Sequence, residues 1–304
     1  MKFPIKLIND NTKINFLSNR KICFIASSLL IAISISFLFI KGLNFGIDFR
    51  GGTLIEIQKI NGDADVSNIR ELMKNIDIGD VQIQEFGSSS DVLIRVEQQN
   101  GGDSAQQNVI KLVKEVIGSQ YEFRRVEVVG PKVSSELVYK GIIAITLAIA
   151  AVVFYIWFRF EWQFSIGAML ALMHDIMITI GLFSILQLEF NLSIIAAILT
   201  IVGYSLNDTV VVYDRIREEL RKYKTMNFLD LLNLAVNSTL SRTTITSVTT
   251  LLALLSLYIF GGEVIRGFTF AMIWGVIIGT YSSIFIAAPV LLYLNVKRDW
   301  SEVS

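Results

Sequence analysis

The sequence has few of the side chains that build metal, redox or disulfide-bonded structures. Its 304 residues include one cysteine, Cys23, and one histidine, His174. A lone cysteine cannot form a disulfide within the chain, and a lone histidine cannot build a histidine-rich metal site. The phosphate-binding pattern G-x-x-x-x-G-K-[ST] does not occur either. These absences argue against a metalloenzyme and against a chain that hydrolyses a nucleotide itself, and they predict no cofactor.

Charge is also scarce. Only 18% of the residues are charged and 53% are hydrophobic, whereas soluble domains carry about a quarter of charged residues. The 27 Lys and Arg balance the 27 Asp and Glu, so no excess of one sign indicates nucleic acid as a partner. The composition predicts an α-helical, polytopic membrane protein.

Six charge-poor stretches are long enough to cross a bilayer, which takes about 20 mostly apolar residues. They are residues 22–40, 141–158, 164–186, 190–213, 243–260 and 267–294. The first is longer than the apolar run of a signal peptide, and no small-x-small cleavage site follows it, so we expect it to remain as an anchor. Lys and Arg gather in residues 1–21, in a basic loop at 214–242 and in a tail at 295–304. By the positive-inside rule, both termini are predicted to be cytoplasmic.

The segment at 41–140 is then predicted to lie outside, as a small folded domain. Strand-like runs occur at 53–58, 81–86, 92–96 and 121–129, and helical spacing occurs at 66–76 and 109–117, with a separator at 87–90. The order βαββαβ is that of a ferredoxin-like domain. Its plainest role is to bind a polypeptide or a neighbouring domain, for instance through a sheet edge.

Ionisable residues within a membrane are costly, and they indicate function by default. Asp208 lies in the fourth span, roughly 9 Å from its cytoplasmic end, and Arg242 begins the fifth span from the same side. The two depths are compatible with an ion pair, which protonation of Asp208 would weaken. The pair is therefore either a proton switch or a static link between two helices.

His174 and Asp175 lie near the middle of the third span. Adjacent helical residues point about 100° apart, so the two cannot face one partner squarely, although both can face the bundle interior. Two interpretations stay open for them, and for Asn207 and Thr243 beside the charged pair: a proton relay or polar packing. The hydroxyl-rich run at 241–250 fits either a hydrated path beside Asp208 or helix packing.

Small residues recur at every fourth position of the sixth span. They are Ala271, Gly275, Gly279, Ser283 and Ala287. Small residues allow two helices in a membrane to approach closely. This pattern predicts a face for helix packing.

Several motifs together resemble those of one family. They are Phe45-Gly46-Ile47-Asp48-Phe49-Arg50-Gly51-Gly52-Thr53 after the first span, residues 129–133 before the second, His174-Asp175, residues 202–218 and residues 241–244. Over nearly its whole length the chain is similar to the SecF members of the SecD/SecF family, which is related to the RND transporters. The resemblance implies six spans that form half of an RND-type bundle, with a periplasmic ferredoxin-like domain between the first and second.

The resemblance also implies a function and partners. The expected partners are SecD, which would supply the other half of the bundle, the SecYEG channel with the SecA ATPase acting upstream, YajC, YidC and the translocating polypeptide. The expected location is the bacterial inner membrane. In the family, SecD and SecF use the proton-motive force late in protein export, and Asp208 and Arg242 match the residues that matter for proton coupling. Protons are then the only coupling ion.

Two other functions stay open. An RND-type efflux pump would carry two large external loops, whereas this chain has one small one. A purely structural subunit would stabilise the translocase without moving protons, and it predicts that Asp208→Asn leaves secretion intact wherever assembly is intact. In the coupled case, we expect movement to reach the external domain through the Gly51-Gly52 and Gly130-Pro131 turns.

Overall fold

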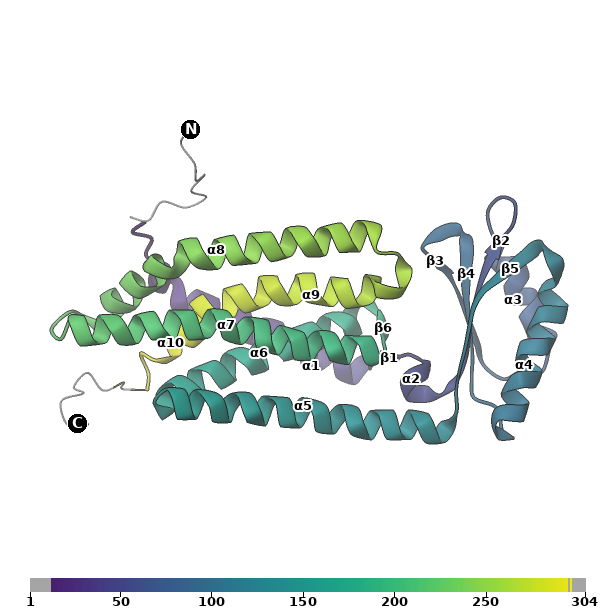
Figure 1. Ribbon diagram of the computed structural model, residues 1–304, viewed down its shortest axis with the longest axis horizontal. Helices are drawn as coiled ribbons and strands as arrows, with labels where there is room; N and C mark the ends of the chain where they lie inside the picture. Colours follow the sequence, from purple (N-terminus) through teal and green to yellow (C-terminus); the bar gives the residue numbers. More distant parts are fainter. Residues whose placement is uncertain (1–11, 295, 297–304) are drawn as a thin grey trace.

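The computed structural model describes residues 12–294 and residue 296, and it consists of a helical bundle with an α+β domain at one end (Figure 1). Six of the helices in the described part are long and apolar enough to cross a membrane. This confirms the predicted fold class. The end of the bundle next to the α+β domain is called the domain end below.

The α+β domain separates the first of the six long helices from the second, and short connections join the remaining ones. They are α1 (Arg20–Ile40), α5 (Pro131–Arg159), α6 (Trp162–Leu186), α7 (Leu192–Lys222), α8 (Phe228–Phe260) and α9 (Glu263–Ser282). A 3₁₀ turn at Phe16–Asn19 precedes α1, while a π-helical turn at Ser283–Ala287 and the short α10 (Ala288–Val290) complete the last span.

The helices extend past several predicted boundaries. Within the predicted basic loop at 214–242, α7 continues to Lys222 and α8 already starts at Phe228, so only residues 223–227 lie between the two helices. Arg215 explains the extension of α7, since it pairs with Glu218 at 2.6 Å and with Glu219 at 2.7 Å on the same helix. Arg242 therefore lies inside α8 and not at its start. α5 likewise begins at Pro131, so the last residues of the segment predicted to lie outside are already helical.

The α+β domain has the predicted order of elements. It contains β2 (Gly52–Lys59), α3 (Val66–Lys74), β3 (Val81–Phe86), β4 (Ser88–Val96), α4 (Gly102–Ile117) and β5 (Tyr121–Val129). The strands form an antiparallel sheet in the order β3-β4-β2-β5, as in ferredoxin-like domains. The predicted separator at 87–90 is too long, because Ser88 already pairs with Phe86 at the hairpin.

The two faces of this sheet have different neighbours. Helices α3 and α4 cover one face, with Ile55, Ile94, Ile69 and Val113 in the core between them. The opposite face, which carries Arg95, is turned toward the bundle (Figure 1). The sheet therefore lies between its own helices and the domain end of the bundle.

The helices of the bundle are buried to different degrees. In the most apolar window of each helix, 56% of α6, 50% of α7 and 61% of the α9 span are buried, against 11% for α1, 11% for α5 and 17% for α8. Helices α6, α7 and α9 thus form the centre of the bundle. The outer helices present apolar side chains outward, as expected for surfaces that face lipid or another subunit.

A short connection that the sequence pattern did not predict joins the two parts. β1 (Asn44–Phe45) and β6 (Glu189–Phe190) form a parallel two-stranded sheet, and α2 (Ile47–Arg50) follows β1. The predicted fourth span therefore starts too early, because Phe190 belongs to β6. Residues 44–50 and 189–192 are called the junction below.

Candidate functional site

A layer of polar side chains lies inside the bundle where α1, α6, α7 and α9 meet. Its members, called the polar layer below, are Ser27, His174, Asp175, Ser205, Tyr281 and Ser282. His174 is 3% exposed and Asp175 is 1% exposed. Buried polar groups are costly unless they find hydrogen-bond partners.

Asp175 finds a partner for each of its carboxylate oxygens. Oδ1 lies 2.9 Å from His174 Nδ1, and Oδ2 accepts hydrogen bonds from the hydroxyls of Ser205 at 2.6 Å and Ser282 at 2.7 Å. Asp175 thereby joins α6 to α7 and α9. Both residues face the bundle interior, as their spacing allows, and they also hydrogen-bond each other, which the sequence pattern did not predict.

The other ring nitrogen of His174 connects the layer to α1. Nε2 lies 3.2 Å from Ser27 Oγ, which in turn lies 3.0 Å from the hydroxyl of Tyr281. The Tyr281 hydroxyl donates to the carbonyl of Cys23 at 3.2 Å, and its ring stacks on the imidazole. Sequence reasoning missed Ser27 and Tyr281, because a single serine or tyrosine in an apolar span carries no periodic signal.

Asp208 lies one turn after Ser205 on α7 but has a different environment. It is 2% exposed, and its Oδ2 has no hydrogen-bond partner among the described residues. The Thr280 hydroxyl and the Arg242 charge act on it electrostatically. Thr280 also hydrogen-bonds Ser247 of α8 at 2.8 Å. Asp208 is thus a buried carboxylate that is only partly satisfied.

The predicted pair of Asp208 and Arg242 is not a direct ion pair in this structure. No ion pair within the described part of the chain joins them, and Arg242 is exposed. Arg242 lies within α8 and is exposed, yet its charge still acts on Asp208. The role of the two residues in proton coupling stays a prediction.

The two neighbours of this pair lie in different places. Thr243 is 2% exposed, and its hydroxyl has no hydrogen-bond partner among the described residues. Asn207 is exposed and points away from the interior. Within the hydroxyl-rich run of α8, Thr246 and Thr249 donate to carbonyls of their own helix. That bonding fits helix packing for these two threonines.

The small residues of α9 allow the close approach that the polar layer needs. An added Cβ on Gly275 would lie 2.3 Å from Ile201 Cγ1, and one on Gly279 would lie 2.9 Å from Ser205 Cβ. The backbone of α9 therefore packs closely against the side chains of Ile201 and Ser205 on α7 at these positions. The predicted packing face is confirmed, and it brings Ser205 and Ser282 to the same carboxylate oxygen.

The motif after the first span forms most of the junction. The Asp48 carboxylate accepts a hydrogen bond of 2.8 Å from the backbone N–H of Leu192, the first residue of α7. Phe45 and Phe49 pack against Phe190 with ring centres 6.0 Å apart in both pairs. The carboxylate of Asp48 also suits the positive end of the α7 dipole. The motif thus attaches the start of the sheet to the start of α7.

Gly51 and Gly52 connect the junction to β2. Their φ angles of +75° and +120° are ones that other residues rarely adopt. A Cβ on Gly52 would lie 2.4 Å from the carbonyl oxygen of Val96. Both conformation and space therefore require glycine at residue 52.

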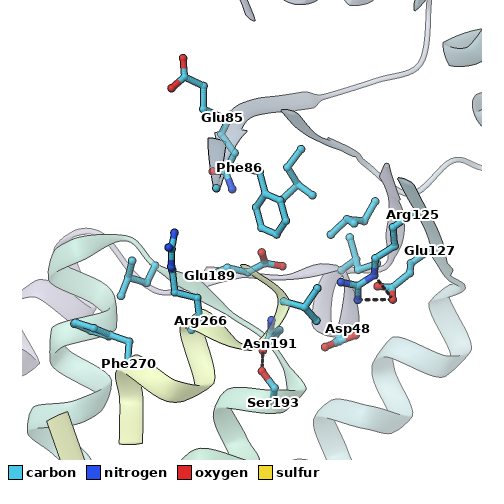
Figure 2. A pocket seen from close by; sticks show the side chains of 18 of the residues that line it. Asp48, Glu85, Phe86, Arg125, Glu127, Glu189, Asn191, Ser193, Arg266 and Phe270 are labelled. Carbon is cyan, nitrogen blue, oxygen red and sulfur yellow. Dashed lines mark hydrogen bonds and ion pairs between the residues drawn. The ribbon is translucent and has the colours of Figure 1, made fainter. Parts of the chain in front are cut away.

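A cleft of about 570 Å³ separates the open face of the sheet from the domain end of the bundle (Figure 2). Glu85 and Phe86 line it from the sheet, and Arg266 and Phe270 line it from α9. Glu189 lies at its floor, and burial raises the pKa of this carboxyl above the ordinary value, although the nearby Arg95 acts in the opposite direction. Its lining combines apolar and charged side chains from two parts of the fold.

Comparison with known proteins identifies the family. Residues 108–297 match the family model described as protein export membrane protein SecD/SecF, C-terminal, and residues 36–58 match the SecD/SecF GG motif. The chain is 46% identical to the protein translocase subunit SecF of Cereibacter sphaeroides, over 98% of this chain and 94% of that one. It is 43% identical to SecF of Rickettsia rickettsii, over 97% and 96% of the two chains.

Comparison of the fold with solved structures identifies the same family. The structure is similar to the crystal structure of SecDF, a translocon-associated membrane protein from Thermus thermophilus, with a TM-score of 0.83 and 33% identity. The match covers 96% of this chain but only 40% of that one. A second SecDF structure, in a super-membrane-facing form, matches with a TM-score of 0.70 and 32% identity. The chain therefore belongs to the SecD/SecF family of protein-export membrane proteins, among the translocase subunits called SecF.

Proposed function

We propose that this subunit couples the proton-motive force to a late stage of polypeptide export, together with SecD. The observation that carries the proposal is the environment of Asp208. Its carboxylate is buried in the centre of the bundle, and one of its oxygens has no hydrogen-bond partner among the described residues. A buried carboxylate in this condition gains from taking up a proton, because the neutral acid is cheaper to bury than the anion.

The energy available to such a site is modest but sufficient for a conformational bias. A proton that crosses 100 mV releases about 2.3 kcal/mol. Arg242 is near enough to act on Asp208 without an ion pair, so a small movement of α8 relative to α7 changes the balance between charge attraction and burial. Binding and release of the proton then alternate with movement of the two helices.

Asp175 and Asp208 are assigned different roles. Asp175 has hydrogen-bond partners on both oxygens, which favours the packing interpretation for this residue and for His174. Asp208 has one oxygen without a hydrogen-bond partner among the described residues, so it is the better proton acceptor. This division makes Asp208 the coupling residue and the polar layer the support that fixes α6, α7 and α9.

SecD is the partner that fits the exposed surfaces. The outer helices are little buried, and α7 and α8 carry exposed polar side chains at Asn207, Arg242 and Thr249. Such side chains are costly in lipid and need a protein partner or water. The similar SecDF chain, of which this chain spans 40%, has room for a second half. The other expected partners, SecYEG, SecA, YajC and YidC, and the inner membrane with cytoplasmic termini, belong to the same proposal.

A purely structural subunit is the second candidate. The hydrogen-bonded polar layer supports it, because a static network can hold four helices together without any proton transfer. The efflux-pump alternative has no such support, since the relatives at 43–46% identity are called protein translocase subunits.

Translocation into inverted membrane vesicles with ATP and SecA separates the two candidates. Asp208→Asn and Arg242→Ala are compared with wild type at equal abundance of the complex. The matched control is Asp214→Asn, because Asp214 lies on the same helix but is exposed and pairs with Arg159 at 3.0 Å. Coupling predicts that the proton-dependent phase is lost in the first two variants and kept in the control. Unchanged rates in all three would leave the subunit as a scaffold.

A further inference from the structure

The α+β domain is covalently attached to the bundle at only two places. One is the Gly51-Gly52 turn before β2, and the other is Gly130, the residue before α5. Neither link alone fixes the angle at which the sheet faces the bundle. Any further restraint must come from contacts between side chains.

One such contact is an ion pair across the interface. Arg95 Nη2 lies 2.7 Å from Glu189 Oε2, with side-chain exposures of 10% and 23%. Arg95 is in β4, opposite Leu54 and Gln82 in the neighbouring strands, so it projects from the middle of the open face of the sheet. Glu189 is in β6, between α6 and α7. The pair therefore connects the sheet directly to the membrane bundle.

The position of Glu189 is itself tightly fixed. Glu189 pairs with Asn44 in the two-stranded sheet of the junction, and a Cβ on Gly46 would lie 2.6 Å from Glu189 Oε1. Asp48 holds the first N–H of α7 in the same junction. Since α7 is one continuous helix from Leu192 to Lys222, the residue that receives Arg95 is attached to the helix that carries Asp208.

Space for movement lies beside this ion pair. The cleft of about 570 Å³ is bounded by Glu85 and Phe86 on the sheet side and by Val264 and Arg266 on the bundle side (Figure 2). The side chains of Glu85 and Val264 are both exposed, that of Val264 to 57%. The ion pair lies at the edge of this space, because Glu189 lines the cleft and Arg95 contacts it from the sheet.

We infer that the Arg95–Glu189 ion pair is a latch that holds the open face of the sheet at a fixed angle to the start of α7, and that its release lets the domain move into the cleft. Arg95 and Glu189 are positioning residues, since neither touches the proton site. Only the link between domain movement and Asp208 rests on the proposed function. Its existence is independent of proton coupling.

Spin-label distances across the cleft test the latch in the full chain, assembled with SecD in lipid nanodiscs. The labels are placed at Glu85→Cys and Val264→Cys in a Cys23→Ser background. Wild type is expected to give one narrow distance distribution. Arg95→Gln and Glu189→Gln are each expected to broaden it toward shorter distances, because each removes the ion pair and leaves only the apolar contact of Leu54 and Leu93 with Ile47 between the open face of the sheet and the junction. The exchange of both charges, Arg95→Glu with Glu189→Arg, is expected to restore the narrow distribution.

The control is Arg125→Gln. Arg125 lines the same cleft and its charge acts weakly on Glu189, but its Nε donates to Glu127 of its own strand at 2.7 Å, so its loss leaves the Arg95–Glu189 ion pair in place and should leave the distribution narrow. An unchanged distribution in both Arg95→Gln and Glu189→Gln overturns the latch. If these variants change the distances while Asp208→Asn leaves export intact, the latch stands and the proposed coupling fails.

Discussion

Substitution of a single glycine in the centre of the bundle should reveal how closely α7 and α9 must approach. An added Cβ at Gly279 would lie 2.9 Å from Ser205 Cβ and 3.3 Å from Ser205 Cα. Ordinary carbon contacts lie at about 3.5–4.0 Å, so Gly279→Ala forces the helices apart by roughly half an ångström. That movement also stretches the hydrogen bond of 2.6 Å from Ser205 to Asp175. Both effects destabilise the bundle.

The magnitude follows from two opposing contributions. Overpacking of a tight contact costs about 1–3 kcal/mol, whereas replacing a helical glycine by alanine gains up to about 1 kcal/mol. Gly203 on α7 provides the matched control, because nothing lies within 4 Å of an added Cβ there. Gly203→Ala is therefore stabilised by the higher helix propensity of alanine and has no packing cost. The two variants should differ by about 1–3 kcal/mol, which is roughly a 5- to 150-fold difference in the unfolding equilibrium.

The assay is unfolding of the purified chain in mixed micelles by increasing SDS, followed by circular dichroism. Gly279→Ala should unfold at a lower SDS fraction than Gly203→Ala. If the two variants unfold at the same fraction, the close contact of α7 and α9 does not contribute as the geometry indicates, and the reasoning about this face is refuted.

The remaining predictions concern the polar layer and the latch. Ser282→Ala removes one donor from Asp175 and should cost about 1 kcal/mol in the same SDS assay; a stability equal to wild type would mean that this bond contributes nothing. Glu189 should make the latch sensitive to pH, because its raised pKa means that the folded state binds the proton more tightly than an ordinary glutamate does. As the pH falls below the raised pKa of Glu189, which lies above the ordinary value of 4.5, the carboxylate takes up a proton and the ion pair with Arg95 is lost. The same proton uptake stabilises the folded state relative to the unfolded state, because the folded state binds the proton more tightly. The charged groups that act on Glu189 are Arg95, Asp48 and Arg125. The spin-label distances should broaden on acidification in wild type and be independent of pH in Glu189→Gln; pH-independent distances in wild type would exclude this switch.

Much of the fold was predictable because it depends on local patterns. The strands at 81–86 and 121–129 alternate apolar and polar residues, and the observed β3 and β5 have the same bounds. Long apolar runs identified six membrane spans. The charge-poor spans are shorter than α7 and α8, because each span ends at the first charge whereas the helices continue past it through ion pairs such as Arg215 with Glu219.

The site was less predictable because it depends on contacts between distant residues. The β1–β6 pair is too short to show any periodicity, yet it places Glu189 opposite Asn44. The partners of Asp175 come from three different helices, and nothing in the sequence indicates which serines face it. The direct pairing of Asp208 with Arg242 was compatible with depth along the helices, but depth does not determine which way Arg242 points from α8.

The central claim is that Asp208 exchanges the coupling proton, and proton flux measures this most directly. The complex with SecD is reconstituted in vesicles that contain a pH-sensitive dye, and flux is followed under an imposed proton gradient with a polypeptide engaged. We predict that Asp208→Asn abolishes the flux, whereas Asp214→Asn, which removes an exposed carboxylate from the same helix, leaves it at the wild-type level. A wild-type flux in Asp208→Asn would contradict the account.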